Sequence, residues 1–313
     1  MNKTLRVGDK GPTVKLLQEI LLELGYHPGP IDGHFGGLTE AALEKFQSVR
    51  KIYADGICGN STYGELREAT SEKGVSWPFS KLGGGDSDPV STGPIYKWVK
   101  CAADQVEGYS GYNRVTLRSD AADSYKNIRD EVLSLGGVIT SAGGRRPLSS
   151  KSSPSRSKKS MHYVGLALDL ALPTGMKDPE KDPYIVVKDD DRYWTVWCRT
   201  DDPNCEEVNL QAAKISRRGS KTVIKYQDVT CRAFNLTEVF RKHGWERIRA
   251  RRSFFRGGSY GGAEWWHFQY EKALEPGTST FGEELLKVYT LDKAKKFVYW
   301  NVAKHCVFGK NWF

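Results

Sequence analysis

An eight-residue pattern that occurs twice near the beginning of the chain constrains the fold most. Residues 32–39 (Asp-Gly-His-Phe-Gly-Gly-Leu-Thr) recur 23 positions later as residues 55–62 (Asp-Gly-Ile-Cys-Gly-Asn-Ser-Thr). Each copy is typical of a glycine-rich turn that ends in a threonine able to cap a following helix. The second copy also has the spacing of a capping box, Thr62-x-x-Glu65. The repeat therefore predicts short helices separated by two similar turns.

The spacing of apolar residues predicts where those helices lie. Residues 12–24 begin with a proline at the first helical position, carry leucines on one stripe and stop before Gly25. A second stripe runs through residues 42–49, and a third begins at Tyr63. We predict a small all-α domain of three helices over residues 1–72, followed by a glycine-rich linker over residues 73–94.

The order of residues in this domain resembles the three-helix peptidoglycan-binding domain. The resemblance covers nearly all of residues 5–70 and implies that bacterial peptidoglycan is the partner. It identifies no individual sugar or peptide contact. It rests on Leu5-Arg6-x-Gly8, Gly11-Pro12-x-Val14, Gln18, Leu24-Gly25-Tyr26, Asp32-Gly33-x-Phe35-Gly36-x-x-Thr39, Phe46-Gln47 and Asp55-Gly56-x-x-Gly59-x-x-Thr62.

Charge and hydropathy limit the partners of the chain. The net charge of +9 suits an anionic partner, which can be a nucleic acid, a membrane surface or a wall polymer. No recognised nucleic-acid-binding module accompanies the basic loops, so we expect no nucleic-acid partner. No segment resembles a membrane span or a signal peptide, so we expect synthesis in a cytoplasm and no stable membrane insertion. We also expect a monomer.

The six cysteines are scattered and include no Cys-x-x-Cys pair. This spacing argues against a structural zinc ribbon and against a thioredoxin-type redox site. We predict reduced thiols, with Cys198 and Cys205 as the first pair to examine for a disulfide.

Two histidines and two carboxylates in the second half of the chain form a candidate zinc site. His162 and Asp169 are seven positions apart and can converge only if the chain turns at Gly165 before a strand. Glu264 and His267 lie far downstream. Two histidines and one aspartate are a catalytic zinc ligand set with one open position, and the spare glutamate can act as a general base. From the residues alone, the alternative that His162 and Asp169 have this spacing by chance stays open.

Strand geometry adds a condition to this site. Residues 264 and 267 would face opposite sides of an ideal strand. Glu264 is therefore predicted at a bent strand end just beyond Gly261-Gly262, with Trp266, His267 and Phe268 in the regular strand.

The residues around the candidate ligands resemble the zinc D-Ala-D-Ala carboxypeptidase and L-alanyl-D-glutamate endopeptidase family. The matching motifs are Ser160-x-His162-x-x-Gly165-x-Ala167-x-Asp169 and Glu264-x-Trp266-His267. The resemblance implies that His162, Asp169 and His267 bind Zn²⁺ and that Glu264 is the general base. The arginine of the family corresponds to Arg145 or Arg146. The local pattern here has an extra residue and no tyrosine, so both arginines stay candidates.

The resemblance also predicts the architecture of the rest of the chain. We expect an α+β fold, in which a small antiparallel sheet with flanking helices forms a zinc peptidase domain over residues 95–313. Residues 177–233 have no counterpart and are an expected insertion containing a hairpin and a further strand. A helix over 120–135, a short strand over 138–140 and a tail packed against the peptidase domain complete the prediction.

These expectations converge on a peptidoglycan hydrolase of the bacteriophage endolysin type. It would cleave a peptide bond in the stem peptide or cross-link, as an endopeptidase in preference to a carboxypeptidase. It would wait in the host cytoplasm until lysis and then reach the wall. The alternatives are a bacterial D-Ala-D-Ala carboxypeptidase and a non-catalytic wall-binding protein with a degenerate peptidase domain. A Gly-x-Ser-x-Gly match at residues 257–261 lacks the strand and helix of a serine-hydrolase nucleophile elbow.

Overall fold

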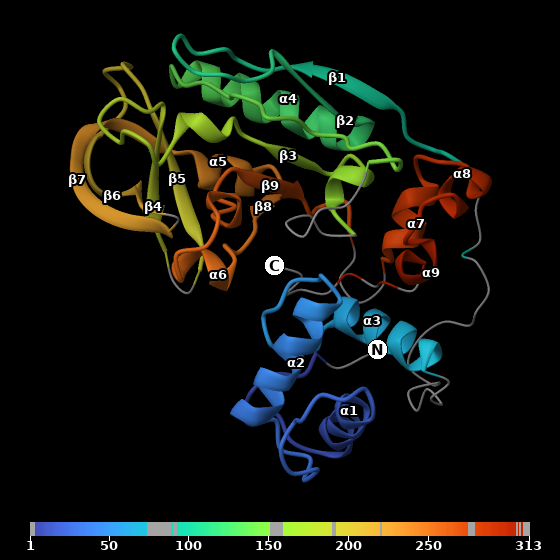
Figure 1. Ribbon diagram of the computed structural model, residues 1–313. Coiled ribbons are helices and arrows are strands. Elements are labelled where there is room, and N and C mark those ends of the chain that lie inside the picture. Colours follow the sequence, from blue (N-terminus) through green and yellow to red (C-terminus); the bar gives the residue numbers. More distant parts are fainter. Residues whose placement is uncertain are drawn as a thin grey trace. The chain divides into compact units, whose positions relative to one another are not determined.

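A computed structural model describes residues 4–73, 89, 93–150, 159–189, 192–219, 221–274, 279–304, 306 and 308. It divides into two compact units (Figure 1). The first unit combines Met1–Ile95, Leu148–Ser160 and Leu274–Trp312, and the second combines Tyr96–Pro147 with Met161–Ala273. Most of the predicted linker, and Asp190-Asp191 within the insertion, lie outside the described residues.

The first unit begins with the three predicted helices. They are α1 (Pro12–Glu23), α2 (Gly37–Val49) and α3 (Asn60–Glu72). Their apolar stripes enclose one core, which includes Leu17, Leu43 and Leu66, each fully buried. The prediction of a small all-α domain at this end of the chain is confirmed.

The sequence repeat becomes a repeated hydrogen-bond network around two buried glutamines. The Nε2 of Gln18 donates to the Oδ1 of Asp32, the carbonyl of His34 and the hydroxyl of Thr39, and its Oε1 accepts from the N–H of Gly33. Gln47 makes the same four contacts with the second copy, to Asp55, Ile57, Thr62 and Gly56. Each glutamine thus satisfies the polar backbone of one turn inside the domain.

The prediction that the repeat threonines cap helices is wrong. The residue capping α2 is Gly36, so Thr39 already lies inside the helix. Thr62 likewise lies inside α3, and Glu65 is fully buried against Arg50 instead of closing a capping box. Both helices start before the threonine, which leaves its hydroxyl free to join the glutamine network.

The tail belongs to the first unit, contrary to the expectation that it packs against the peptidase domain. Its helices are α7 (Phe281–Leu286), α8 (Leu291–Lys295) and α9 (Trp300–Ala303). α9 contacts α3, and the N–H of Ile95 donates to the carbonyl of Lys287. Phe281 and Cys306 are fully buried in this unit. Trp312 and Phe313 lie outside the described residues.

The second unit is built on a small antiparallel sheet. Its strands are β3 (Ala167–Asp169), β9 (His267–Tyr270) and β8 (Trp245–Arg247), in the order β3-β9-β8. Beside it lie the hairpin of β1 (Trp98–Ala102) and β2 (Arg114–Arg118) and the helices α4 (Ser119–Ser134) and α5 (Leu236–Lys242). Phe240 of α5 stacks on Phe268 of β9 with ring centroids 4.2 Å apart. The α+β prediction is confirmed.

Residues 138–140 do not form the predicted strand. The N–H of Ile139 donates to the carboxylate of Asp104, and that of Thr140 donates to the hydroxyl of Tyr184. Side chains therefore accept from both of these N–H groups, and no strand ladder forms there.

The insertion folds into a closed four-stranded barrel. Its strands are β4 (Tyr184–Lys188), β5 (Trp194–Arg199), β6 (Glu207–Arg218) and β7 (Lys221–Asn235), in the order β4-β5-β7-β6 (Figure 1). The predicted β4–β5 hairpin and the strand beginning at residue 221 are confirmed, whereas β6 and the barrel closure were missed. Ile185, Leu210 and Val229 are among the side chains that fill it.

Two further findings concern the whole described chain. None of its helices combines the length and the apolar composition needed to cross a bilayer. All six cysteines, including Cys198 and Cys205, are free thiols in the structure.

Candidate metal centre

His162 and Asp169 are brought together by a turn at Gly165. His162 lies in the short 3-10 helix η1 (Met161–Tyr163), and Asp169 ends β3. Gly165 has φ +72°, in the left-handed region that favours glycine. A Cβ there would lie 2.4 Å from the Trp98 ring. The turn predicted from the sequence is confirmed, and only glycine fits it without strain.

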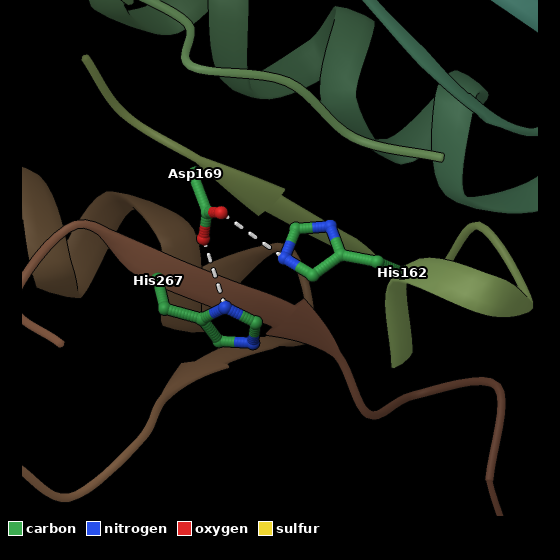
Figure 2. A group of neighbouring side chains, drawn as sticks. All are labelled: His162, Asp169 and His267. Carbon is green, nitrogen blue, oxygen red and sulfur yellow. Dashed lines mark hydrogen bonds and ion pairs between the residues drawn. The ribbon is translucent and has the colours of Figure 1, made fainter. Parts of the chain in front are cut away.

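Asp169 lies between the two imidazoles. It is directly opposite His267 in the β3–β9 register, and the Nδ1 of His267 is 2.9 Å from its Oδ1. The Nε2 of His162 is 3.2 Å from its Oδ2 (Figure 2). One ligand atom from each of the three residues lies within 4.8 Å of the other two. Sheet pairing and the Gly165 turn thus join residues about a hundred positions apart.

Outer contacts select the tautomer of each histidine. The Nδ1 of His162 is 2.6 Å from the carbonyl oxygen of Gly144, which accepts a hydrogen bond from Nδ1–H and leaves Nε2 directed at the site. The Nε2 of His267 is 3.3 Å from the Oε1 of Gln269, which leaves Nδ1 for the site. With both imidazoles neutral, the two histidines and the Asp169 carboxylate would fit a zinc ion with an open coordination position.

The three ionisable groups of the cluster shift one another's pKa values. Burial opposes ionisation of Asp169, but the two imidazoles outweigh it and hold the pKa of that carboxyl well below its usual value. Burial lowers the pKa of His162, so this imidazole is neutral. Burial also acts against the charged form of His267, but the hydrogen bond and charge of Asp169 outweigh it and raise the pKa of His267.

Glu264 lies just before β9 in a bent backbone conformation. Its φ is +55°, and its carbonyl accepts from the N–H of His267 at 3.2 Å. The predicted bend at Glu264 beyond Gly261-Gly262 is confirmed, but Trp266 lies in the turn before β9 and not in the regular strand as predicted. A non-glycine residue at positive φ is uncommon and costs about 1–3 kcal/mol, so the surroundings must hold it there.

Arg251 is the immediate partner of Glu264. Its Nε lies 3.1 Å from the Oε1 of Glu264, and both side chains are mostly buried. Burial raises the pKa of the Glu264 carboxyl, and the charge of Arg251 offsets part of that rise. A carboxylate with a raised pKa beside a metal site suits proton transfer near neutral pH.

The two candidate arginines face different surroundings. The backbone N–H of Arg146 donates to the carbonyl of His162 at 2.8 Å, and the Arg146 charge helps to lower the pKa of His162. The guanidinium of Arg145 lies over the Trp98 ring, 4.3 Å from its centroid. Arg145 also lines a polar cavity of about 450 Å³ that includes Gly144. Both arginines therefore stay near the site, Arg146 beside a ligand and Arg145 at the adjoining cavity.

Sequence reasoning missed three contributors to the site. They are the carbonyl of Gly144, the amide of Gln269 and the guanidinium of Arg251. Gln269 has a sequence signal, because it stands two positions after His267 and so shares its face of the strand. Arg251 lies within a loop rich in arginine, and nothing in its local sequence distinguishes it from its neighbours.

Comparison with known protein families identifies the amino-terminal domain. Residues 10–66 match the family described as "Putative peptidoglycan binding domain". Part of the chain is similar to an N-acetylmuramoyl-L-alanine amidase, CwlM, of Mycobacterium tuberculosis. That similarity is 45% identity over 56 residues, which is 18% of this chain and 14% of the amidase. The predicted peptidoglycan-binding resemblance is confirmed.

A second relative covers more of the chain. The zinc D-Ala-D-Ala carboxypeptidase of Streptomyces albus G is 28% identical over 173 residues, which is 53% of this chain and 60% of that protein. The chain thus spans less than two thirds of either curated relative. Among solved structures, a Burkholderia AP3 phage endolysin matches 24% of this chain and 27% of its own at 37% identity. Its TM-score of 0.20 is too low to bear on the fold.

Proposed function

We propose that this protein is a zinc-dependent peptidoglycan hydrolase that cleaves a peptide bond in the stem peptide or cross-link. The observation that carries the proposal is the convergence of His162, Asp169 and His267 to within 4.8 Å, close to Glu264. The similarity to a zinc D-Ala-D-Ala carboxypeptidase and the peptidoglycan-binding match of residues 10–66 support the same substrate class.

In this proposal the three clustered residues hold Zn²⁺, and Glu264 is the general base. Bound zinc would acidify a water molecule and polarise the substrate carbonyl. Glu264 accepts a proton from the attacking water and returns it to the departing amine as the C–N bond breaks. Arg251 keeps Glu264 ionised before the first transfer and holds its carboxyl group in place during both. Arg146 or Arg145 steadies an anionic group of the substrate or the developing oxyanion.

The biological setting is part of the proposal. The amino-terminal domain would anchor the enzyme to the wall while the second unit cuts, and the enzyme would be a bacteriophage endolysin. It would stay in the host cytoplasm until lysis begins. Endopeptidase action is proposed ahead of carboxypeptidase action.

Digestion of purified peptidoglycan, followed by mass spectrometry of the products, tests the reaction. New amino groups on D-glutamate or on the cross-linking diamino acid are expected. Release of free D-alanine alone would instead support a carboxypeptidase. Binding to wall fragments without zinc and without cleavage would support a non-catalytic wall-binding protein.

The role of Glu264 is tested by Glu264→Gln. The amide keeps the shape of the side chain but cannot accept the proton. We expect cleavage to fall by about a thousandfold or more while zinc stays near one ion per chain. Cleavage at the unsubstituted rate would refute the mechanism.

A further inference from the structure

The barrel inserted between β3 and β9 contacts the segment that carries Arg251 and Glu264. This segment runs from β8 through α6 (Arg252–Phe255) and the 3-10 helix η3 (Tyr260–Gly262) to β9. The barrel approaches it with the end of the β4–β5 hairpin, where Arg192 and Trp194 lie. Both side chains are buried, Arg192 at 7% and Trp194 at 1% exposure.

Each of these two side chains bonds the residue immediately before one member of the Arg251–Glu264 pair. The indole Nε1 of Trp194 donates to the carbonyl of Ala263 at 2.8 Å, one residue before Glu264. The guanidinium of Arg192 donates to the carbonyl of Ala250 at 3.3 Å, and its own carbonyl accepts from the Ala250 N–H at 2.8 Å. The hairpin therefore fixes the backbone at both ends of the ion pair.

The hairpin is itself held firmly against this segment. Arg247 of β8 donates to the carbonyl of Trp194 at 2.6 Å and pairs with the carboxylate of Asp189 at 2.6 Å. The Trp194 ring stacks on Phe255 of α6, with centroids 5.6 Å apart and planes at 21°. A buried, doubly anchored donor can hold a neighbouring peptide in an unfavourable conformation.

We infer that the β4–β5 hairpin of the insertion positions the general base, with Trp194 and Arg192 as positioning residues for the Arg251–Glu264 pair. The inference rests on the proposed role of Glu264. Glu264 needs such support because its φ of +55° is unfavourable for an L-residue and because its carboxylate must face the cluster. The insertion thereby gains a role in the reaction, although none of its described residues belongs to the ligand cluster.

Trp194→Phe in the full-length protein is the direct test. Phenylalanine keeps a ring on Phe255 but removes the N–H that reaches Ala263. On soluble peptidoglycan fragments we expect kcat to fall about three- to tenfold, with KM and the zinc content unchanged. Trp197→Phe is the matched control, since Trp197 lies on the same strand but packs with the barrel core. We expect that control to keep kcat within about twofold.

A double-mutant cycle separates positioning from general stability. If Trp194 acts through the ion pair, its substitution should cost clearly less in an Arg251→Met background than in the unsubstituted protein. A purely structural role predicts equal losses in both backgrounds. Arg192→Lys, which loses the guanidinium contact with Ala250, repeats the measurement from the other end of the pair.

The possible outcomes distinguish this inference from the proposed function. Equal kcat in Trp194→Phe and Trp197→Phe, or additive losses with Arg251→Met, would overturn the positioning role alone. Loss of the fold in both Trp194→Phe and Arg192→Lys would assign the hairpin to stability and also overturn it. Full activity of Glu264→Gln would instead refute the proposed function.

Discussion

The Nε of Arg251 lies 3.1 Å from the Oε1 of Glu264, although nothing in the local sequence distinguishes Arg251 from other arginines of its loop. The two side chains are 26% and 14% exposed, so water screens their interaction only in part. This pair sets both the charge and the direction of the proposed base. It also supplies a measurable pH dependence.

Arg251→Met should shift the acid limb of the kcat/KM profile to higher pH. Burial raises the pKa of Glu264, and the Arg251 charge partly offsets it, so removing that charge raises the pKa further. The base then becomes protonated at a higher pH as the solution is acidified. Arg256→Met removes the same charge from an exposed position in the same loop and should leave the limb in place. An unshifted limb in Arg251→Met would contradict the assignment of Glu264.

Zinc affinity should fall as the pH falls through the raised pKa of His267. The metal needs a neutral imidazole, and Asp169 favours the protonated one. One competing proton weakens binding by roughly tenfold per pH unit below that pKa. Competition against a fluorescent chelator between about pH 6 and pH 8.5 measures the slope. Asp169→Asn, which removes a ligand, should bind zinc weakly throughout this range. A pH-independent affinity in the unsubstituted protein would count against the ligand set.

Gly165→Ala should destabilise the second unit and lower zinc occupancy. The added Cβ would meet the Trp98 ring at 2.4 Å and the backbone nitrogen of Arg118 at 2.8 Å, at a φ of +72°. Strain and overpacking together should cost about 2–4 kcal/mol. Gly219→Ala is the control, because Gly219 has φ +62° with nothing within 4 Å of its Cβ, and should cost about 1–2 kcal/mol. Thermal unfolding and zinc content compare the two, and equal effects would show that packing at Gly165 is unimportant.

Gln47→Ala should destabilise the peptidoglycan-binding domain. The substitution leaves the N–H of Gly56 without its partner and removes one donor from the Oδ1 of Asp55 and from the carbonyl of Ile57. We expect a loss of about 2–4 kcal/mol, and a similar one for Gln18→Ala because the networks match. Gln211→Ala, at an exposed barrel position, should change stability by less than about 0.5 kcal/mol. Thermal unfolding of the full-length protein measures all three, and a neutral Gln47→Ala would show that the network contributes little.

Much of the fold followed from short-range patterns. The repeated turns and apolar stripes predicted α1 to α3, because helix periodicity and glycine turns are set by residues within a few positions of one another. The β4–β5 hairpin and the bend before β9 were predicted on the same basis. The prediction of threonine caps was wrong because the start of a helix depends on which hydrogen-bond partners the turn residues find. Here Gln18 and Gln47, distant in sequence, are the partners of the two threonines.

The closure of the barrel and the place of the tail are parts of the fold that local sequence patterns did not predict. β6 has an irregular alternation of polar and apolar residues, and only its pairing with β7 and β4 makes it a barrel strand. The apolar residues of the tail could pack against an apolar surface of either unit, so their pattern alone does not identify the unit. Its membership of the first unit depends on contacts between α9 and α3, which lie more than two hundred positions apart.

The sequence by itself determined the donor types and the glycine that lets His162 and Asp169 approach, because these depend on residue chemistry and on one backbone angle. Only the tertiary structure decided that Asp169 lies opposite His267, that Arg146 adjoins His162, and that Arg251 and Trp194 support Glu264. Strand register and the packing of the insertion fix those neighbours. Both result from contacts summed over whole elements, which no local stretch of sequence encodes.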